Sequence, residues 1–249
     1  MKISDTLNKT TKTLFSFEIL PPLKGATLEE IYQTVEPLME FNPPYINVTY
    51  HREEVLYNEL PSGMIEKRVV KKRPGTVGIA AALRYHYKVN VVPHIICGGF
   101  SKDETENALI DLHFLGINNV LAVRGDAERG MKSFQADPQG HAYAVDLVKQ
   151  IVDLNNGKYL DEGLENATAT DFCIGVAGYP EKHSESPNYE SDIRYLKQKV
   201  DAGADYIVTQ LFFDNQTFFD FVDRCRKAGI TVPIVAGIKP ISVRSHLQI

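Results

Sequence analysis

Short apolar runs alternate with amphipathic helical patterns along almost the whole sequence. Seven runs rich in Val, Ile, Phe and Tyr are expected to be strands, at residues 14–20, 45–50, 89–96, 119–126, 172–179, 206–213 and 232–238. Strands that alternate with helices predict a parallel sheet with helical crossovers. Two intervals are longer than one strand–helix unit, and they predict insertions at about 51–75 and at 127–140 with 155–171.

Capping boxes and glycines mark the ends of several helices. Thr27 with Glu30, and Ser101 with Glu104, each precede apolar residues at helical spacing. The second of these helices is expected to stop at Gly116. Glycines also close two more patterns, Gly203 after the one at 192–202 and Gly229 beyond the one at 218–225.

The polarity of the first strands decides between two architectures, because doubly wound sheets and barrels both alternate strands with helices. Phe15, Phe17 and Ile19 share one face of the first strand, whereas Glu18 lies on the other. In the second strand, residues 46 and 48 are apolar and residues 47 and 49 are polar. An apolar face toward helices and a polar face toward a lumen favours the (β/α)8 TIM barrel.

We expect residues 1–249 to form a single barrel domain from which the last βα unit is missing. A closed barrel of this type needs eight strands, and the pattern provides seven. The sequence stops at Ile249, seven residues after Ser242, which has the character of a helix start.

Charge and hydropathy exclude several classes of partner. The chain has 27 Lys and Arg against 32 Asp and Glu, a net charge of −5, which argues against general binding to nucleic acid or an anionic membrane. No apolar run approaches the ~20 residues that span a bilayer. The start of the chain lacks the apolar core of a signal peptide. We therefore expect a soluble protein in a reducing compartment, most simply the cytoplasm.

Cysteine spacing and known motifs narrow the chemistry further. Cys97, Cys173 and Cys225 lie far apart among apolar residues, which predicts buried free thiols and no metal site. The sequence contains no G-x-G-x-x-G, no G-x-x-x-x-G-K-[ST] and no H-E-x-x-H. These absences argue against a Rossmann cofactor domain, a P-loop NTPase and a zinc protease.

Two carboxylates lie near the carboxyl ends of predicted strands, where barrel enzymes hold their catalytic groups. Glu18 lies inside the apolar run FSFEILPP, so desolvation is expected to raise its pKa and suit it to general acid catalysis. The alternative is a structural pair with an arginine or lysine of the lumen. Asp126 ends the fourth strand after Arg124 and Gly125. Its alternative role is to cap the next element.

Other polar residues at strand ends give weaker signals. Thr49, Gln210, His94 and His183 could contact a ligand, but each residue taken singly is more often a hydrogen-bonded core residue. Tyr179 precedes a proline and could place a ring at the mouth of the barrel.

One predicted helix face adds a further candidate group. Asp192, Tyr195 and Lys199 share this face, and a solvated ion-pair face is the alternative. Together the residues indicate a barrel enzyme with a wide polar mouth, and they do not identify the substrate.

Nine segments, taken in order, resemble the methylenetetrahydrofolate reductase family. They span residue 14 to about 240, and the ordered set is far more specific than any single segment. The segments are Ser16-Phe17-Glu18 with Pro21-Pro22, Asn47-Val48-Thr49-Tyr50, Pro93-His94, Ala122-Val123-Arg124-Gly125-Asp126, Tyr143-Ala144-Val145-Asp146-Leu147, Ala177-Gly178-Tyr179-Pro180-Glu181 with His183, Lys199-Val200-Asp201-Ala202-Gly203-Ala204, Thr209-Gln210-Leu211-Phe212-Phe213-Asp214 and Pro233-Ile234-Val235-Ala236-Gly237-Ile238.

The resemblance implies a flavin-dependent catalytic barrel that reduces 5,10-methylenetetrahydrofolate to 5-methyltetrahydrofolate. It implies non-covalent FAD, NADH or NADPH as hydride donor, a ping-pong cycle and a place in one-carbon metabolism that supplies methionine synthesis. It also leads us to expect a homo-oligomer with a small-molecule folate substrate.

The same resemblance assigns roles to individual residues. Glu18 would be the general acid that protonates N10 of the folate. Asp126 would lie near the flavin and the pterin, Gln210 would contact folate and nicotinamide, and Thr49 would contact nicotinamide. The residues expected to hold FAD are Tyr50, His94, Arg124, Gly125, Asp126, Tyr143, Ala144, Tyr179, His183, Asp192 and Lys199.

Two departures and two alternatives accompany this resemblance. Leu211 stands where bacterial relatives often have an aromatic residue, and the charged insertion at 51–75 matches no expected element. The alternatives are another FAD barrel that acts on an amine or imine, and a non-catalytic fragment that binds flavin or folate.

Overall fold

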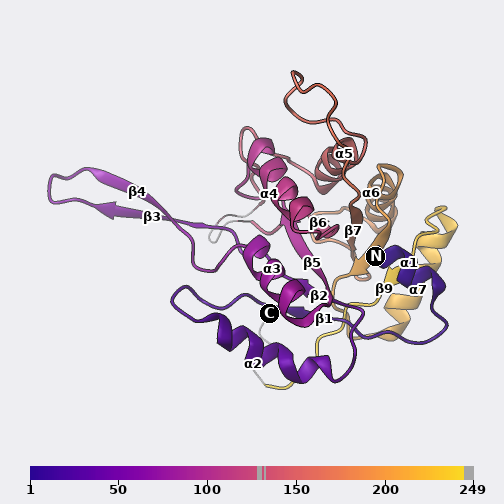
Figure 1. The fold of residues 1–249 in the computed structure, drawn as a ribbon. Coiled ribbons are helices and arrows are strands. Elements are labelled where there is room, and N and C mark those ends of the chain that lie inside the picture. The colour runs from indigo at the N-terminus through magenta and orange to yellow at the C-terminus, as the bar shows by residue number, and fades with distance from the viewer. Residues whose placement is uncertain (128–130, 132, 244–249) are drawn as a thin grey trace.

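A computed structural model describes residues 1–127, 131 and 133–243 of the chain. Seven strands form one parallel sheet in the order β1 (Phe17–Ile19), β2 (Tyr45–Val48), β5 (Asn90–Ile96), β6 (Asn119–Val123), β7 (Cys173–Gly178), β8 (Tyr206–Thr209) and β9 (Ile234–Val235). This order follows the sequence and never reverses, whereas a doubly wound sheet reverses at its switch point. The predicted α/β barrel-type fold, with a curled parallel sheet, is confirmed (Figure 1).

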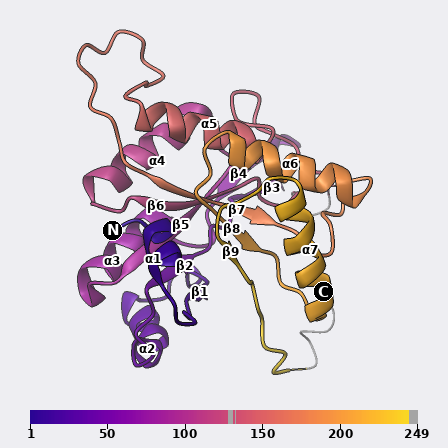
Figure 2. The same cartoon turned by 90° about the vertical axis from the view of Figure 1, so that its right-hand side faces the viewer.

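Helices lie in an arc around the strands (Figure 2). They are α2 (Leu28–Met39), α3 (Thr76–Tyr87), α4 (Lys102–Phe114), α5 (Ala144–Asn155), α6 (Tyr189–Asp201) and α7 (Asn215–Lys227). The main core lies between these helices and the sheet, where Val35, Ile46, Leu83, Leu112 and Ile151 are fully buried.

Local signals explain where the helices start and stop. Both predicted capping boxes are confirmed, and in the second the Glu104 N–H donates to Ser101 Oγ at 3.2 Å. Gly116 follows α4 with a φ of +66°, a conformation that favours glycine. The predicted start of α6 at residue 192 is wrong. The helix starts three residues earlier, at Tyr189, because the side chain of the cap residue Asn188 accepts from the Ser191 N–H at 2.8 Å.

The strands are found at the predicted places but are shorter than predicted. The run at 206–213 leaves the sheet after Thr209, although the Gln210 N–H still donates to Gly178 O at 2.8 Å. The predicted polarity holds for Ile46 and Val48, which are buried under the helices. It fails for Phe15, which precedes β1 and is 67% exposed.

A short helix that the sequence analysis does not predict, α1 (Ile3–Lys9), closes the amino-terminal end of the barrel. Its Ile3 side chain is buried against Tyr45, Leu121 and Tyr206, which fill the interior of the barrel at this end. The Ile3 N–H donates to Asn119 Oδ1 at 2.9 Å, which ties the helix to the start of β6. The lumen is therefore packed at this end and can hold a ligand only at the other.

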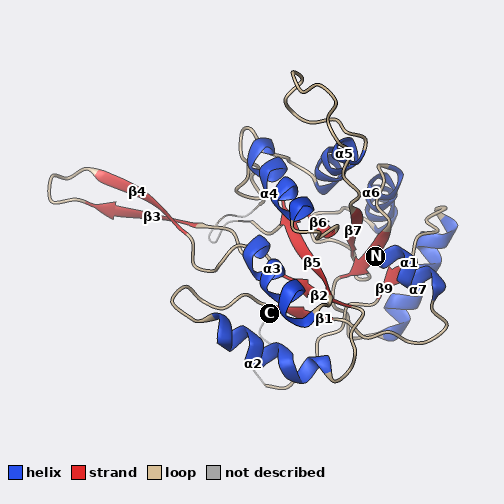
Figure 3. Cartoon of the chain, in the orientation of Figure 1, coloured by secondary structure: helices blue, strands red, loops and turns tan. Residues whose placement is uncertain are grey.

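The insertion at 51–75 contains an antiparallel hairpin of β3 (Glu54–Glu59) and β4 (Ile65–Val70), coloured as a red pair in Figure 3. Residues 156–171 form an irregular loop, and part of the 127–140 segment lies outside the described residues. The helix expected after Ser242 also falls on residues outside this description.

Two expectations from composition can be compared with the structure. The predicted state of Cys97, Cys173 and Cys225 is confirmed, since all three are free and buried. Across the described ranges, we find no helix with the length and apolar character needed to cross a membrane.

Candidate active site

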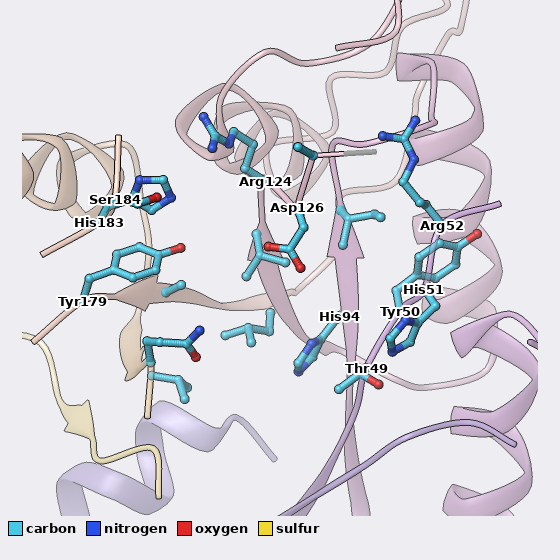
Figure 4. A pocket seen from close by; sticks show the side chains of 18 of the residues that line it. Thr49, Tyr50, His51, Arg52, His94, Arg124, Asp126, Tyr179, His183 and Ser184 are labelled. Atoms are coloured by element: carbon cyan, nitrogen blue, oxygen red, sulfur yellow. The ribbon is translucent and has the colours of Figure 1, made fainter. Parts of the chain in front are cut away.

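A cavity of about 1110 Å³ opens at the carboxyl ends of the strands. This is the end of a barrel where parallel strands present their final side chains and loops together. Six successive strands contribute to its wall through residues such as Glu18, Thr49, His94, Val123, Ala177 and Gln210. Figure 4 shows side chains from both sides of the barrel pointing into this space.

Glu18 projects from β1 into the cavity, as the sequence predicts. Desolvation raises the pKa of its carboxyl group above the usual value, although 53% of the side chain is exposed. In the described part of the chain, the basic group found within 4 Å of Glu18 is His94, whose Nε2 lies 3.5 Å from Glu18 Oε2. No ion pair between Glu18 and an arginine or lysine is found in the part of the chain that the structure describes. The alternative that Glu18 forms such a structural pair is therefore wrong for this part of the chain.

His94 is a neutral neighbour for that acid. The residue lies on β5 and is buried, and burial lowers the pKa of its imidazole to about 4. Within the described residues, its Nε2 has no hydrogen-bond partner that satisfies normal geometry. A buried nitrogen without a partner costs free energy, so it is available to a ligand in the cavity.

Asp126 follows β6 in a turn that brings its carboxylate over the cavity (Figure 4). Gly125 permits this turn with a φ of +84°, and a Cβ there would lie 3.5 Å from Ile96. The alternative role as a helix cap is wrong for the described helices. The next one, α5, starts at Ala144 with Tyr143 in the cap position.

Thr49 and Gln210 lie on opposite sides of the barrel mouth. The Thr49 hydroxyl donates to Ile19 O at 3.3 Å, which leaves its oxygen able to accept from a ligand. The Gln210 side-chain oxygen accepts from the Leu211 N–H at 3.3 Å, which orients the amide group. Both residues line the large cavity and carry no charge.

A second cavity of about 390 Å³ adjoins the first beside β6 and β7. The walls of the two cavities share Val123, Arg124, Ala177, Tyr179, His183 and Glu185, and the two adjoining cavities together are called the elongated space. The remaining predicted FAD residues line the smaller part, and these are Tyr143, Ala144, Asp192 and Lys199. All the candidate residues from the sequence thus border one of the two cavities.

Asp192 and Lys199 on α6 are not part of a solvated face, so that alternative is wrong for both. Asp192 is buried and accepts from Ser186 Oγ at 2.6 Å. The Lys199 ammonium points inward and donates to Ala177 O at 2.5 Å. Desolvation lowers the pKa of Lys199 to about 8, and the Asp192 carboxylate opposes this shift. Tyr195, on the same helix, is 46% exposed.

Arg124 is the principal cation where the two cavities meet. Its Nη1 donates to Glu185 Oε2 at 2.6 Å, and its guanidinium lies 4.9 Å from the centre of the Phe134 ring. Lys182, in the same loop as Glu185, donates to the carbonyl oxygens of His183 and Ser186 and so fixes the loop.

Two tyrosines and two further histidines at the site stay uncharged at neutral pH. Burial raises the pKa of Tyr50 and of Tyr179 to about 12, so both remain hydroxyl donors. Desolvation lowers the pKa of His51, assisted by Arg73, and that of His183, assisted by Arg124.

Several residues of the cavity wall are not predicted from the sequence. His51 and Arg52 directly follow the predicted Thr49-Tyr50 segment, and this continuation past a strand end is the signal that could have identified them. Lys182 and Glu185 flank His183 in the loop after β7. Nothing in their local sequence reveals that Glu185 meets Arg124, which is 61 residues away.

The fold and the cavity define a barrel-type α/β protein with a polar site at the carboxyl ends of its strands. The methylenetetrahydrofolate reductase family model matches residues 2–249, and the chain belongs to this family. It is 35% identical over 254 residues to methylenetetrahydrofolate reductase (NADH) 1 of Arabidopsis thaliana, an alignment that covers 97% of this chain and 38% of the plant protein. It is 32% identical over 227 residues to 5,10-methylenetetrahydrofolate reductase of Salmonella typhimurium, covering 91% and 64% of the two chains.

The chain therefore spans about two fifths of the length of the plant relative and just under two thirds of the bacterial one. Among solved structures, it resembles an uncharacterized protein from Clostridium thermocellum that binds two copies of 5-methyl-5,6,7,8-tetrahydrofolic acid. The TM-score is 0.56 at 14% identity, and the match covers 99% of this chain and 72% of that one. At this identity the likeness supports the fold.

Proposed function

We propose that this chain is a catalytic barrel that reduces 5,10-methylenetetrahydrofolate to 5-methyltetrahydrofolate. NADH or NADPH would provide the reducing equivalents, and FAD would bind without a covalent bond. The observation that carries the proposal is Glu18, a carboxyl group with a raised pKa at the mouth of a cavity of about 1110 Å³. Family membership supplies the reaction, and the acid gives it a chemical basis in this chain.

The residues of the elongated space fit the parts of FAD. Ile96, Leu121 and Val208 supply apolar wall for a flat ring system. Arg124 can meet an anionic diphosphate, and Tyr179 offers a neutral hydroxyl donor. The unpartnered Nε2 of His94 is a further polar group directed at this space. When bound, FAD supplies hydride transfer between the nicotinamide and the folate.

Glu18 would transfer its proton to N10 of the folate and so open the five-membered ring to a cationic 5-iminium ion. A general acid works best when its pKa lies near the operating pH, and desolvation shifts Glu18 in that direction. Since His94 is neutral, it does not lower the pKa of Glu18 as a cation would.

Asp126, Gln210 and Thr49 would position and stabilise the reacting groups. The Asp126 carboxylate would attract the cationic iminium in a partly dry site, which favours ring opening. The Gln210 amide would bind folate and nicotinamide in turn, which suits a ping-pong cycle in which both use one face of the cofactor. The Thr49 hydroxyl oxygen would accept a hydrogen bond from the nicotinamide amide.

Anaerobic half-reactions on the protein reconstituted with FAD test the proposal. We expect the protein to take up FAD, NADH or NADPH to bleach the flavin absorption band, and 5,10-methylenetetrahydrofolate to restore it. Failure to take up FAD would overturn the proposal. Restoration by an imine but not by the folate, or bleaching of the oxidised flavin by an amine, would point to a different flavin barrel.

A further inference from the structure

The β3–β4 hairpin projects away from the barrel as an arm (Figures 1 and 3). Each of its strands pairs with the other over six residues, from Glu54 opposite Val70 to Glu59 opposite Ile65. Within the described chain, neither strand has another partner in a sheet. An isolated two-stranded hairpin is at best marginally stable in water, so this arm needs a covering layer.

The two faces of the arm differ in chemistry. Side chains alternate along each strand, which places Tyr57, Ile65 and Val69 on one face, where they are 68%, 70% and 56% exposed. The other face carries the polar residues Glu54, Asn58, Glu66 and Arg68 together with Leu56 and Val70. Such alternation is typical of an antiparallel sheet that packs one face against another layer.

We propose that the apolar face of the arm packs against the same face of the arm of a second copy of this chain, forming a two-fold symmetric dimer. Complete burial of the exposed side chains on both faces removes at most about 1,000 Å² from solvent, which lies at the lower limit for a specific interface. Because the interface uses one surface twice, it closes as a dimer and does not extend into a filament.

The charges on this face are self-complementary. Its charged residues are Glu59 and Lys67, which lie in neighbouring rows of the ladder, and neither forms an ion pair in the part of the chain that the structure describes. A two-fold axis that crosses the arms between these rows places Glu59 of each copy beside Lys67 of the other. The same axis sets the two barrels at opposite ends of the paired arms, where they do not collide.

Cysteine cross-linking tests this arrangement directly, because the three native cysteines are buried and the engineered thiol is then the accessible one. Ile65→Cys places a thiol on the apolar face. Glu66→Cys, the next residue, places one on the opposite face and is the matched control. With a short bifunctional maleimide, we expect Ile65→Cys to yield a covalent dimer and Glu66→Cys to remain uncoupled.

Sedimentation equilibrium of the unmodified chain provides the second measurement. We expect a dimer, and we expect the double change Tyr57→Lys with Ile65→Lys to raise its dissociation constant about tenfold or more, since buried aromatic anchors dominate interfaces. A monomeric unmodified chain would overturn the proposal. So would equal cross-linking from both faces, which indicates edge-to-edge pairing, or a dimer that both lysines leave intact.

Discussion

Replacing Glu185 with Gln should strengthen binding of FAD and of ADP to the site. The Glu185 carboxylate accepts a hydrogen bond from Arg124 Nη1 at 2.6 Å, on the wall that the two cavities share. A diphosphate that binds Arg124 must displace or share this carboxylate. The Gln side chain has nearly the same size but carries no charge, so it competes less for the guanidinium.

The exposure of the pair sets the size of the effect. The Arg124 side chain is 21% exposed and that of Glu185 is 45% exposed. An ion pair that is partly open to solvent contributes roughly 0.5–1 kcal/mol, which corresponds to about a two- to fivefold gain in affinity when it no longer competes. Arg124 lowers the pKa of Glu185, so the difference between the two proteins should disappear as the pH falls through that lowered value.

Fluorescence titration of the apoprotein with FAD, and competition with ADP, measure this effect. Glu181→Gln is the matched control, because Glu181 is an exposed carboxylate of the same loop and borders neither cavity. Raising the salt concentration should narrow the gap between wild type and Glu185→Gln. A weaker affinity in Glu185→Gln would refute the reasoning, since it would mean that the carboxylate contacts the ligand. An affinity equal to that of the control would show that the ion pair does not compete.

Three further predictions concern the acid, the second carboxylate and the lumen. The rate of folate reduction should fall as the pH rises through the raised pKa of Glu18, because the protonated carboxyl group is required. The rate of flavin reduction by NADH, measured by stopped flow over the same pH range, should not depend on this ionisation. Asp126→Asn should raise the flavin reduction potential and slow folate turnover, because a negative charge that disfavours the anionic reduced flavin and attracts the iminium ion is lost; unchanged values would remove Asp126 from the catalytic residues. Gly175→Ala should destabilise the fold by about 1–3 kcal/mol in urea unfolding, because its Cβ would lie 2.5 Å from Tyr206 Cζ. Gly78→Ala in α3, where the Cβ meets nothing within 4 Å, is the control and should be neutral or stabilising.

Periodicity in the sequence predicts the elements whose apolar residues enter the main core. The seven strands and the helices with capping boxes belong to this group, because burial imposes a regular pattern on them. Strand ends are less predictable. Residues 210–213 belong to the same apolar run as β8 but form the loop that follows it. Composition alone does not distinguish the strand from the loop.

Elements outside the main core are missed for physical reasons. Helix α1 has a single fully buried residue, Ile3, so it shows no helical period. The arm mixes charged and apolar side chains and lacks the Asn-Gly or Asp-Gly turn that signals a hairpin.

Some features of the site could be predicted from the sequence and others could not. Glu18, Thr49 and Gln210 could be predicted because strand ends converge in a barrel. The partnership of Arg124 with Glu185 could not, because it depends on how two loops approach each other in space.

The most direct test of the account is the effect of Glu18→Gln on the two half-reactions. Gln keeps the size and hydrogen-bonding capacity of the side chain but has no proton to transfer. Flavin reduction by NADH or NADPH should be unchanged, because that half-reaction needs no acid. Reoxidation of the flavin by 5,10-methylenetetrahydrofolate should slow by roughly 10²–10⁴, the usual contribution of a positioned general acid. An equal loss in both half-reactions would contradict the account and would assign Glu18 a structural role.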